Sequence, residues 1–244
     1  MQNFVRLPLE GAYNVRDMGG YPTAFGGMTA WRAFIRADDL HDLSKRDIDF
    51  LLDYGLKTVI DLRGADETDL DPNPFAKMAG IDYHNIPILV DKIDDITLSA
   101  VSTYKPQEIM SIFYVHILTE AKAAIRKIFA AIADAKDGAV LFHCRVGKDR
   151  TGIIAVLLLG LGGVSRADII TNYTASFHYI IENPKIIRMI NDSIPDLYYS
   201  KSEYIEPALK FIESEFGNTE NYLRHVGLSD EQLEKIKNRL CVKK

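Results

Sequence analysis

The stretch that decides the fold is AVLFHCRVGKDRTGIIAVLLLGLGG, residues 139–163. Residues 139–143, AVLFH, are a short and mostly apolar run, which is the pattern of a buried parallel strand. Residues 151–163 form a longer apolar run that ends at Gly162 and Gly163, the pattern of a buried helix and its stop. Only the short segment CRVGKDR separates the two. We therefore expect Cys144 at the carboxyl end of a strand, just before the N-terminus of a helix, where sites form in α/β sheets.

Similar signals extend outward from this stretch. Short apolar segments at 29–38, 57–62 and 81–89 predict further strands. Ser44 and Asp47 resemble a capping box, followed by a helix that ends near Gly55, and residues 106–135 have the composition and spacing of one or two helices. Paired glycines at 14–23 and 24–28 predict hairpin turns. Alternating strands and helices predict an α/β fold with a mostly parallel sheet flanked by helices.

Beyond Ser165 the pattern is helical only. The predicted helices cover 165–180, 184–191, 202–215 and 229–240. We find no linker or internal repeat, so residues 1–244 are predicted to form a single domain. Residues 165–244 would be a helical C-terminal extension that packs against the sheet and can serve as a lid over the site.

Composition excludes several classes of protein. The chain has 244 residues, 47% of them hydrophobic, and a net charge of -5, which argues against nucleic acid as a partner. The two cysteines do not make a disulfide framework, so a reducing compartment, the cytoplasm, is expected, with a secreted protein without disulfides as the alternative. The N-terminus lacks the pattern of a signal peptide. The longest apolar run, 152–164, is shorter than the about 20 residues of a membrane span, so none is expected.

The residues of the loop suit phosphoryl chemistry. A cysteine before a helix N-terminus is favoured as a thiolate, which makes Cys144 a candidate nucleophile. The amides of Arg145, Val146, Gly147, Lys148 and Asp149 can surround an oxyanion, and Arg150 can bind two of its oxygens. Thr151 places a hydroxyl near the sulfur, Gly152 completes the loop, and His143 can orient it. This chemistry needs no metal and no cofactor.

The loop also has to be distinguished from a plain buried cysteine and from a Walker A loop. A lone cysteine after a strand is most often a small buried side chain. A Walker A phosphate loop would need a glycine where Phe142 stands and Ser or Thr where Asp149 stands, so it is excluded. The combination of Cys144, Gly147, Arg150 and Thr151 favours a phosphate-binding loop with a nucleophile. Cys241 has no such context.

HCRVGKDRTG, residues 143–152, resembles the C-x5-R phosphate-binding loop of cysteine-dependent protein tyrosine phosphatases. Its GKDRTG form is similar to bacterial tyrosine phosphatases, some of which also act on phosphoserine, phosphothreonine and phosphoinositides. NVRDMGGY, FIRADDL and VIDLRGADE look like that family's N-terminal motifs. The resemblance implies a sheet of four to five strands, Cys144 as nucleophile, Arg150 as phosphate binder, and a phosphorylated protein or a phosphoinositide as substrate.

The general acid is the main departure from that resemblance. Tyrosine phosphatases with a Trp-Pro-Asp loop take the acid from it, but Arg32 follows the only tryptophan, Trp31. Three places can supply a carboxylic acid instead: Asp149 in the loop, Asp61 after a predicted strand, and the segment from Asp91 to Asp95. Asp61 is alternatively a structural partner of Arg63 or Arg36. The acidic segment is alternatively a solvated loop.

Several alternatives stay open on the sequence alone. Lys148 either favours substrates with several negative charges or forms a structural ion pair. Tyr173 and Phe177 fit core packing better than a phosphotyrosine slot. The leading function is metal-independent phosphomonoester hydrolysis on phosphotyrosine, with dual specificity as an extension and phosphoinositide hydrolysis as an alternative. The alternatives from other classes are a weakly catalytic phosphate-binding module and a sulfur- or arsenate-handling enzyme.

Overall fold

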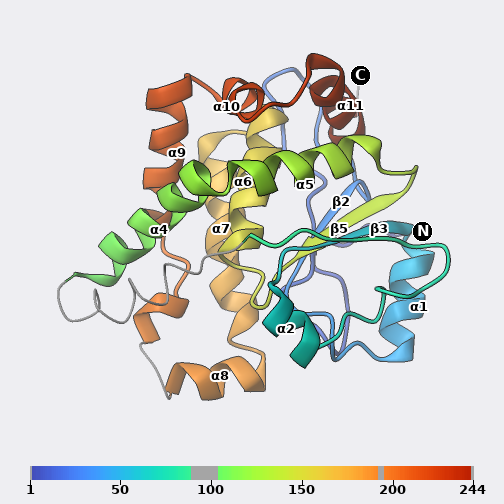
Figure 1. The fold of residues 1–244 in the computed structure, drawn as a ribbon. Helices are drawn as coiled ribbons and strands as arrows, with labels where there is room; N and C mark the ends of the chain where they lie inside the picture. The colour runs from blue at the N-terminus through green and yellow to red at the C-terminus, as the bar shows by residue number, and fades with distance from the viewer. Residues whose placement is uncertain (1, 89–103, 192–194, 243–244) are drawn as a thin grey trace.

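The computed structural model describes residues 2–88, 104–191 and 195–242, and Figure 1 shows helices packed around a central sheet. Within these residues the sheet has five strands in the order β1-β2-β5-β3-β4. Their bounds are β1 Arg16–Asp17, β2 Phe34–Ala37, β3 Leu56–Asp61, β4 Asp82–Asn85 and β5 Ala139–His143. β1 is antiparallel to β2 and every other pairing is parallel. The predicted α/β fold with a mostly parallel sheet is confirmed.

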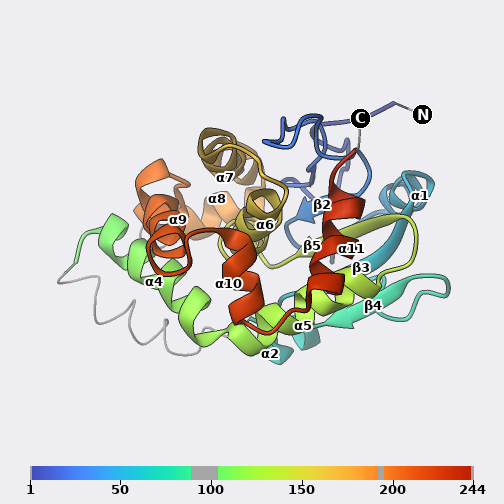
Figure 2. The same ribbon diagram turned by 90° about the horizontal axis from the view of Figure 1, so that it is seen from above.

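The central strand β5 is buried along its whole length and faces two cores. Val140 and Phe142 join the larger core, whereas Ala139 and Leu141 join the smaller one. This alternation follows from the two-residue period of a strand. Helix α1, Lys45–Asp53, lines the smaller core. Figure 2 shows α1 and α5 on opposite sides of the strands.

The larger core unites the sheet with most of the helices. They are α4 Pro106–Glu120, α5 Lys122–Asp134, α6 Arg150–Leu161, α7 Arg166–Ile180, α9 Ser202–Phe216, α10 Thr219–His225 and α11 Asp230–Leu240. Helix α6 is buried on nearly all sides, which explains why its sequence has no polar face. The short elements α8, Pro184–Asn191, and η1, Pro195–Tyr198, follow α7 along the chain.

Several local predictions are confirmed by the helix ends. Ser44 and Asp47 form the predicted capping box of α1, and α11 begins at the predicted place, with Ser229 and Gln232 as a capping box of its own. Ser165 caps α7. The predicted helical segment 106–135 divides into two helices at Ala121.

Other local predictions are corrected by the structure. The strand expected at 29–38 begins only at Phe34, because residues 31–33 form a turn in which Arg32 has a φ of 62°. The strand expected at 81–89 covers only 82–85 in the described residues. Helices α2, Ala65–Leu70, and α10 are additional to the predicted elements. No residue of α2 is buried, so its sequence carries no apolar periodicity.

The C-terminal helices pack into the fold, and the last described residues lie beside residues 22–29, where Pro22 and Met28 form an isolated antiparallel bridge. Cys241, after α11, forms an isolated bridge with Thr29, which brings the end of α11 against the N-terminal region. Buried side chains of α7, α9, α10 and α11 belong to the same core as the sheet. Among the described residues, no helix has both the length and the apolar character that crossing a membrane requires.

Candidate active site

The loop from Cys144 to Asp149 joins the end of β5 to the start of α6; we refer to residues 144–149 as the phosphate loop. β2, β5 and β3 run parallel, so their carboxyl ends lie at the same edge of the sheet. Cys144 therefore lies between the residues that follow β2 and those that follow β3. Its side chain is buried, with 2% of it exposed.

The backbone of the phosphate loop is held from the N-terminal part of the chain. Asn14 donates its side-chain amide to the carbonyl oxygens of Val146, at 3.2 Å, and Gly147, at 3.0 Å. The carbonyl of Arg145 accepts from the Asp39 amide at 3.1 Å. Gly147 has a φ of +70°, a conformation that side chains other than glycine resist. The loop is thus fixed by contacts on several of its carbonyls.

Arg150, the first residue of α6, is held by Glu67 of α2. Arg150 Nη1 and Nη2 donate to the two carboxylate oxygens of Glu67 at 2.5 and 2.8 Å. The Gly64 amide donates to the same carboxylate at 3.0 Å. Burial lowers the pKa of Arg150, but the bonds to Glu67 and the nearby charge of Cys144 outweigh it and the pKa is raised. The guanidinium is therefore a permanent cation in a fixed orientation.

Glu67 is a site residue that the sequence alone does not identify. It stands at the end of VIDLRGADE, residues 59–67, one of the motifs that carry the family resemblance. That motif is the available signal, although nothing in it specifies a contact with Arg150.

Asp149 lies at the N-cap of α6 and is part of a polar cluster with two tyrosines. Its Oδ1 accepts from the Tyr114 hydroxyl at 2.6 Å and lies 3.3 Å from Lys148 Nζ. The Tyr114 and Tyr173 hydroxyls are 2.5 Å apart. Burial and then the charge of Asp149 raise the pKa of Tyr114, which keeps its proton for this bond. The Asp149 side chain is 25% exposed, so its carboxyl group retains access to solvent.

Asp61 is placed differently, in a buried ion-pair network. Its side chain is fully buried and accepts from Arg63 Nη2 at 2.7 Å and from the Tyr83 hydroxyl at 3.0 Å. His143 Nε2 lies 3.3 Å away. Burial alone would raise the pKa of Asp61, but His143 and Arg63 hold it well below its ordinary value. These contacts match the alternative in which Asp61 is the structural partner of Arg63.

His143 links that network to the phosphate loop. Its Nε2 lies 2.8 Å from the side-chain nitrogen of Asn73, and its Nδ1 lies 3.3 Å from the carbonyl oxygen of Cys144. The imidazole is fully buried. His143 thus contacts the backbone next to the candidate nucleophile.

Lys148 points away from open solvent. Its ammonium group donates to the carbonyls of Leu197 and Tyr199, and only 2% of its side chain is exposed. With Asp149 also 3.3 Å away, the charge is already bound within the protein. Lys148 therefore ties the phosphate loop to η1 and to Tyr199, the residue that follows it.

The remaining predicted residues are at the start of α6. Thr151 is fully buried, and its hydroxyl has no hydrogen-bond partner within the described ranges. A side chain at Gly152 would come within 3.3 Å of the Tyr173 ring. Tyr173 is buried in the larger core, as the packing interpretation expects. The segment from Asp91 to Asp95 lies outside the described residues.

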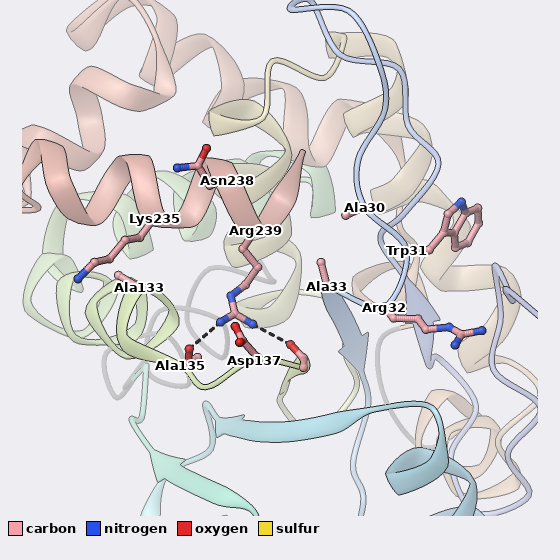
Figure 3. A pocket seen from close by; sticks show the side chains of 11 residues that line it. Ala30, Trp31, Arg32, Ala33, Ala133, Ala135, Asp137, Lys235, Asn238 and Arg239 are labelled. Atoms are coloured by element: carbon pink, nitrogen blue, oxygen red, sulfur yellow. Dashed lines mark hydrogen bonds between the residues drawn. The ribbon is translucent and has the colours of Figure 1, made fainter. Parts of the chain in front are cut away.

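A hollow of about 600 Å³ lies elsewhere in the molecule, between α11 and the 30–33 turn (Figure 3). In it Arg239 donates to the carbonyls of Ala135, at 2.6 Å, and Gly138, at 2.7 Å. None of the residues that line it belongs to the phosphate loop. A smaller hollow of about 50 Å³ is lined by Arg145, and thus lies beside the loop. The volume of a hollow therefore does not mark the chemical site here.

Comparison with known proteins places these residues in a family context. A model of the tyrosine phosphatase family matches residues 7–242. The chain is 36% identical to the tyrosine-protein phosphatase of Nostoc commune, over 85% of this chain and 74% of that protein. It is 27% identical to a putative tyrosine-protein phosphatase of Cupriavidus necator, over 86% and 80% of the two chains. Identity to the triple specificity protein phosphatase PtpB of Mycobacterium tuberculosis is 24%, over 94% and 96%.

Proposed function

Because this chain belongs to the tyrosine phosphatase family, we propose that it hydrolyses phosphomonoesters through a phosphocysteine formed on Cys144. The observation that carries the proposal is the juxtaposition at the sheet edge. A buried cysteine follows β5, a loop with anchored carbonyls comes next, and Arg150 opens α6 with its fork already oriented by Glu67. Such preorganised donors stabilise the charge of a transferring phosphoryl group.

The proposed reaction has two displacements at phosphorus. The Cys144 thiolate attacks in line, the S–P bond forms, and the bond from phosphorus to the leaving oxygen breaks as that oxygen takes a proton from an acid. Water then attacks the phosphocysteine, the S–P bond breaks, and phosphate leaves while the carboxylate receives a proton from the water. Arg150 and the loop amides hold the equatorial oxygens in both steps.

Asp149 is the proposed proton donor. It is the carboxyl group of the phosphate loop itself, it retains solvent access, and Tyr114 fixes its orientation. Asp61 is a weaker candidate, because Arg63 and His143 hold its pKa low and its side chain is fully buried. A group that stays a carboxylate near neutral pH has no proton to donate.

The proposed substrate is a phosphotyrosine-containing protein, with activity on phosphoserine and phosphothreonine as an extension. The support is the family match and the printed names of the relatives, one of which is a triple specificity phosphatase. Phosphoinositide hydrolysis is the second candidate. The contacts of Lys148 weigh against a direct role for that cation in binding a further phosphate, because its ammonium group already bonds two carbonyls.

Substitution of the nucleophile tests the reaction. Cys144→Ser is expected to abolish hydrolysis of p-nitrophenyl phosphate while still binding a phosphotyrosine peptide, and Cys241→Ser is the matched control that keeps full activity. Full activity in Cys144→Ser would refute the proposal. Tight peptide binding with negligible turnover by the wild-type protein at every pH would instead favour a phosphate-binding module.

Leaving-group dependence tests the acid. Asp149→Asn should lose most activity on a substrate with a poor leaving group and lose the basic limb of the pH profile, with a loss of about 10²-fold or more. Any loss of activity in folded Asp61→Asn and Asp91→Asn proteins should be the same on substrates with good and with poor leaving groups. If Asp61→Asn or Asp91→Asn shows the selective loss on the poor leaving group and Asp149→Asn does not, Asp149 is not the general acid.

A further inference from the structure

Two arginine side chains, Arg16 of β1 and Arg36 of β2, are buried beside the phosphate loop. Their exposed fractions are 3% and 0%. In the part of the chain that the structure describes, their hydrogen bonds go only to neutral groups: Asn172, Ser176 and the carbonyl of Gly147. A buried charge without an opposite charge is unfavourable unless something else requires it. The burial of this pair therefore points to a functional role.

Arg36 is the member of the pair that contacts the phosphate loop. Its Nη2 donates to the Gly147 carbonyl at 2.7 Å and its Nη1 to Asn172 Oδ1 at 2.6 Å. The strand register accounts for this position, because Arg36 pairs with Phe142 of β5, two residues before Cys144. At Gly147 a side chain would lie 2.6 Å from the carbonyl oxygen of Ala37, so β2 and the loop are in direct contact.

The contact fixes the direction of one loop peptide. The carbonyl of Gly147 accepts from both Arg36 and Asn14. In a planar trans peptide the N–H points opposite to the C=O. The amide of Lys148 is therefore turned away from Arg36 and Asn14, as a loop that binds an anion with its amides requires.

The guanidinium of Arg36 lies close to the nucleophile, because it bonds Gly147 of the loop that begins at Cys144 and its strand partner Phe142 stands two residues before Cys144. Burial lowers the pKa of Arg36 to about 10, while the charges of Tyr21 and Cys144 work in the opposite direction, so Arg36 is a cation at neutral pH. In the described part of the chain, the other charged or titratable groups around Cys144 and Arg36 include Arg145, Lys148, Arg150, His143, Asp149, Glu67, Tyr114, Tyr173, Arg16, Tyr21 and Asp38. Arg150 is already paired with the carboxylate of Glu67, whereas Arg36 has no carboxylate bound to it among the described residues.

We propose that Arg36 is a positioning residue that holds the Gly147 peptide of the phosphate loop and, with its uncompensated charge, stabilises the thiolate of Cys144. The proposal rests on the function proposed above, in which that thiolate is the nucleophile. Arg16 is a natural comparison, because it is equally buried and shares Asn172 and Ser176 but makes no bond to the loop.

The test measures thiolate formation directly. In a Cys241→Ser background, the rate of alkylation by iodoacetamide is followed against pH, and its midpoint reports the ionisation of Cys144. Arg36→Gln should raise that midpoint by about one pH unit, the order expected for loss of a close opposite charge. The control Arg16→Gln should shift it by no more than about a third as much. A folded Arg36→Gln protein with the wild-type midpoint would overturn the proposal.

A second variant separates charge from geometry. Arg36→Lys keeps the charge but loses the two-point contact with Gly147 and Asn172. Its alkylation midpoint should therefore rise by no more than about half of the rise seen in Arg36→Gln. Inhibition by inorganic phosphate should weaken by roughly tenfold, because the loop amides lose their orientation. If Arg36→Lys binds phosphate as tightly as the wild type, the positioning role is wrong.

A measurement on the wild-type protein removes the dependence on folding of the variants. The guanidinium ¹⁵N resonances of Arg36 should shift with pH at the alkylation midpoint, and this transition should be lost in Cys144→Ser. An unperturbed Arg36 resonance would contradict the electrostatic role even if no variant folds.

The outcomes also separate the two proposals. If Cys144→Ser retains full phosphatase activity, the proposed function fails, whatever Arg36 does. If Cys144→Ser is inactive but a folded Arg36→Gln protein keeps the wild-type alkylation midpoint, only the role of Arg36 fails.

Discussion

At the scale of single residues, the site depends on which carboxylates are already paired with an arginine. Glu67 is bound to Arg150, and Asp61 to Arg63, whereas Asp149 accepts from a neutral tyrosine hydroxyl besides Lys148. A bidentate pair fixes the plane of a guanidinium. Glu67 therefore removes the freedom of the Arg150 side chain to turn away, while the N–H groups that do not bond Glu67 can still face a phosphate.

The first prediction concerns this anchor. Glu67→Gln keeps the size of the side chain but loses the charge-assisted pair, so Arg150 becomes less well oriented. We expect kcat/KM for p-nitrophenyl phosphate to fall by roughly tenfold or more. Steady-state kinetics on the purified variant measure it. The control is Asp66→Asn, an exposed neighbour on α2, which should behave as the wild type. Unchanged kinetics in Glu67→Gln would show that Arg150 keeps its orientation without the charge of Glu67.

At the scale of elements, the stretch 139–163 is predictable because all of its signals are local. An apolar strand, a loop with Gly147 and a helix stopped by paired glycines each follow from adjacent residues. Helix α2 is not predictable from the sequence, because none of its residues is buried and so no apolar periodicity marks it. The contact of Glu67 with Arg150 is equally hidden, since it follows from the pairing of β3 with β5. Long-range pairing of this kind leaves no mark at either residue.

The phosphate loop is also linked to the residues that follow α8 along the chain. Lys148 is the side chain that bonds the carbonyls of Leu197 and Tyr199. The sequence alone leaves its role open between substrate binding and structure. Its burial and these two contacts indicate that the conformation of the loop and that of residues 195–199 are coupled.

The second prediction follows from that coupling. Lys148→Met removes both bonds and leaves the two carbonyls without their donor, so residues 196–200 should open more readily. Hydrogen exchange of the amides in this segment should accelerate by about tenfold, corresponding to about 1.4 kcal/mol. Lys201→Met is the control, because Lys201 stacks on the rings of Tyr199 and Tyr204 and, within the described residues, donates its ammonium group to no carbonyl of this segment. Equal exchange in both variants would argue against the coupling.

At the scale of the whole molecule, the buried network of Asp61 makes stability depend on pH. The folded protein holds the pKa of Asp61 low, whereas the unfolded chain has the ordinary value of about 3.9. Below that pH the unfolded state takes up a proton that the folded state does not. The stability contributed by Asp61 is therefore present above about pH 4 and is lost as the pH falls further.

The third prediction tests this sign. At pH 7, Asp61→Asn should lower the free energy of unfolding by about 3 kcal/mol, because Arg63 loses a buried partner. Urea titrations between pH 7 and pH 2.5 should show the difference from the wild type narrowing as the pH falls. Asp49→Asn, an exposed substitution on α1, should give a small and constant difference. A gap that widens in acid would contradict the lowered pKa.

The larger core joins the strands to the C-terminal helices, and this decides whether 165–244 is a separable lid. Tyr204, Ile205 and Ala208 of α9 are fully buried in that core, together with Tyr114 of α4. Removing residues 165–244 would expose that surface and the α6 helix, which has no polar face. We therefore expect the truncated chain 1–164 to lack a cooperative fold, and the full chain to unfold in one transition. Coincident urea curves from far-ultraviolet circular dichroism and from the fluorescence of Trp31 would support a single domain. Two separated transitions, or a folded and active 1–164 fragment, would instead make the helical segment an independent lid.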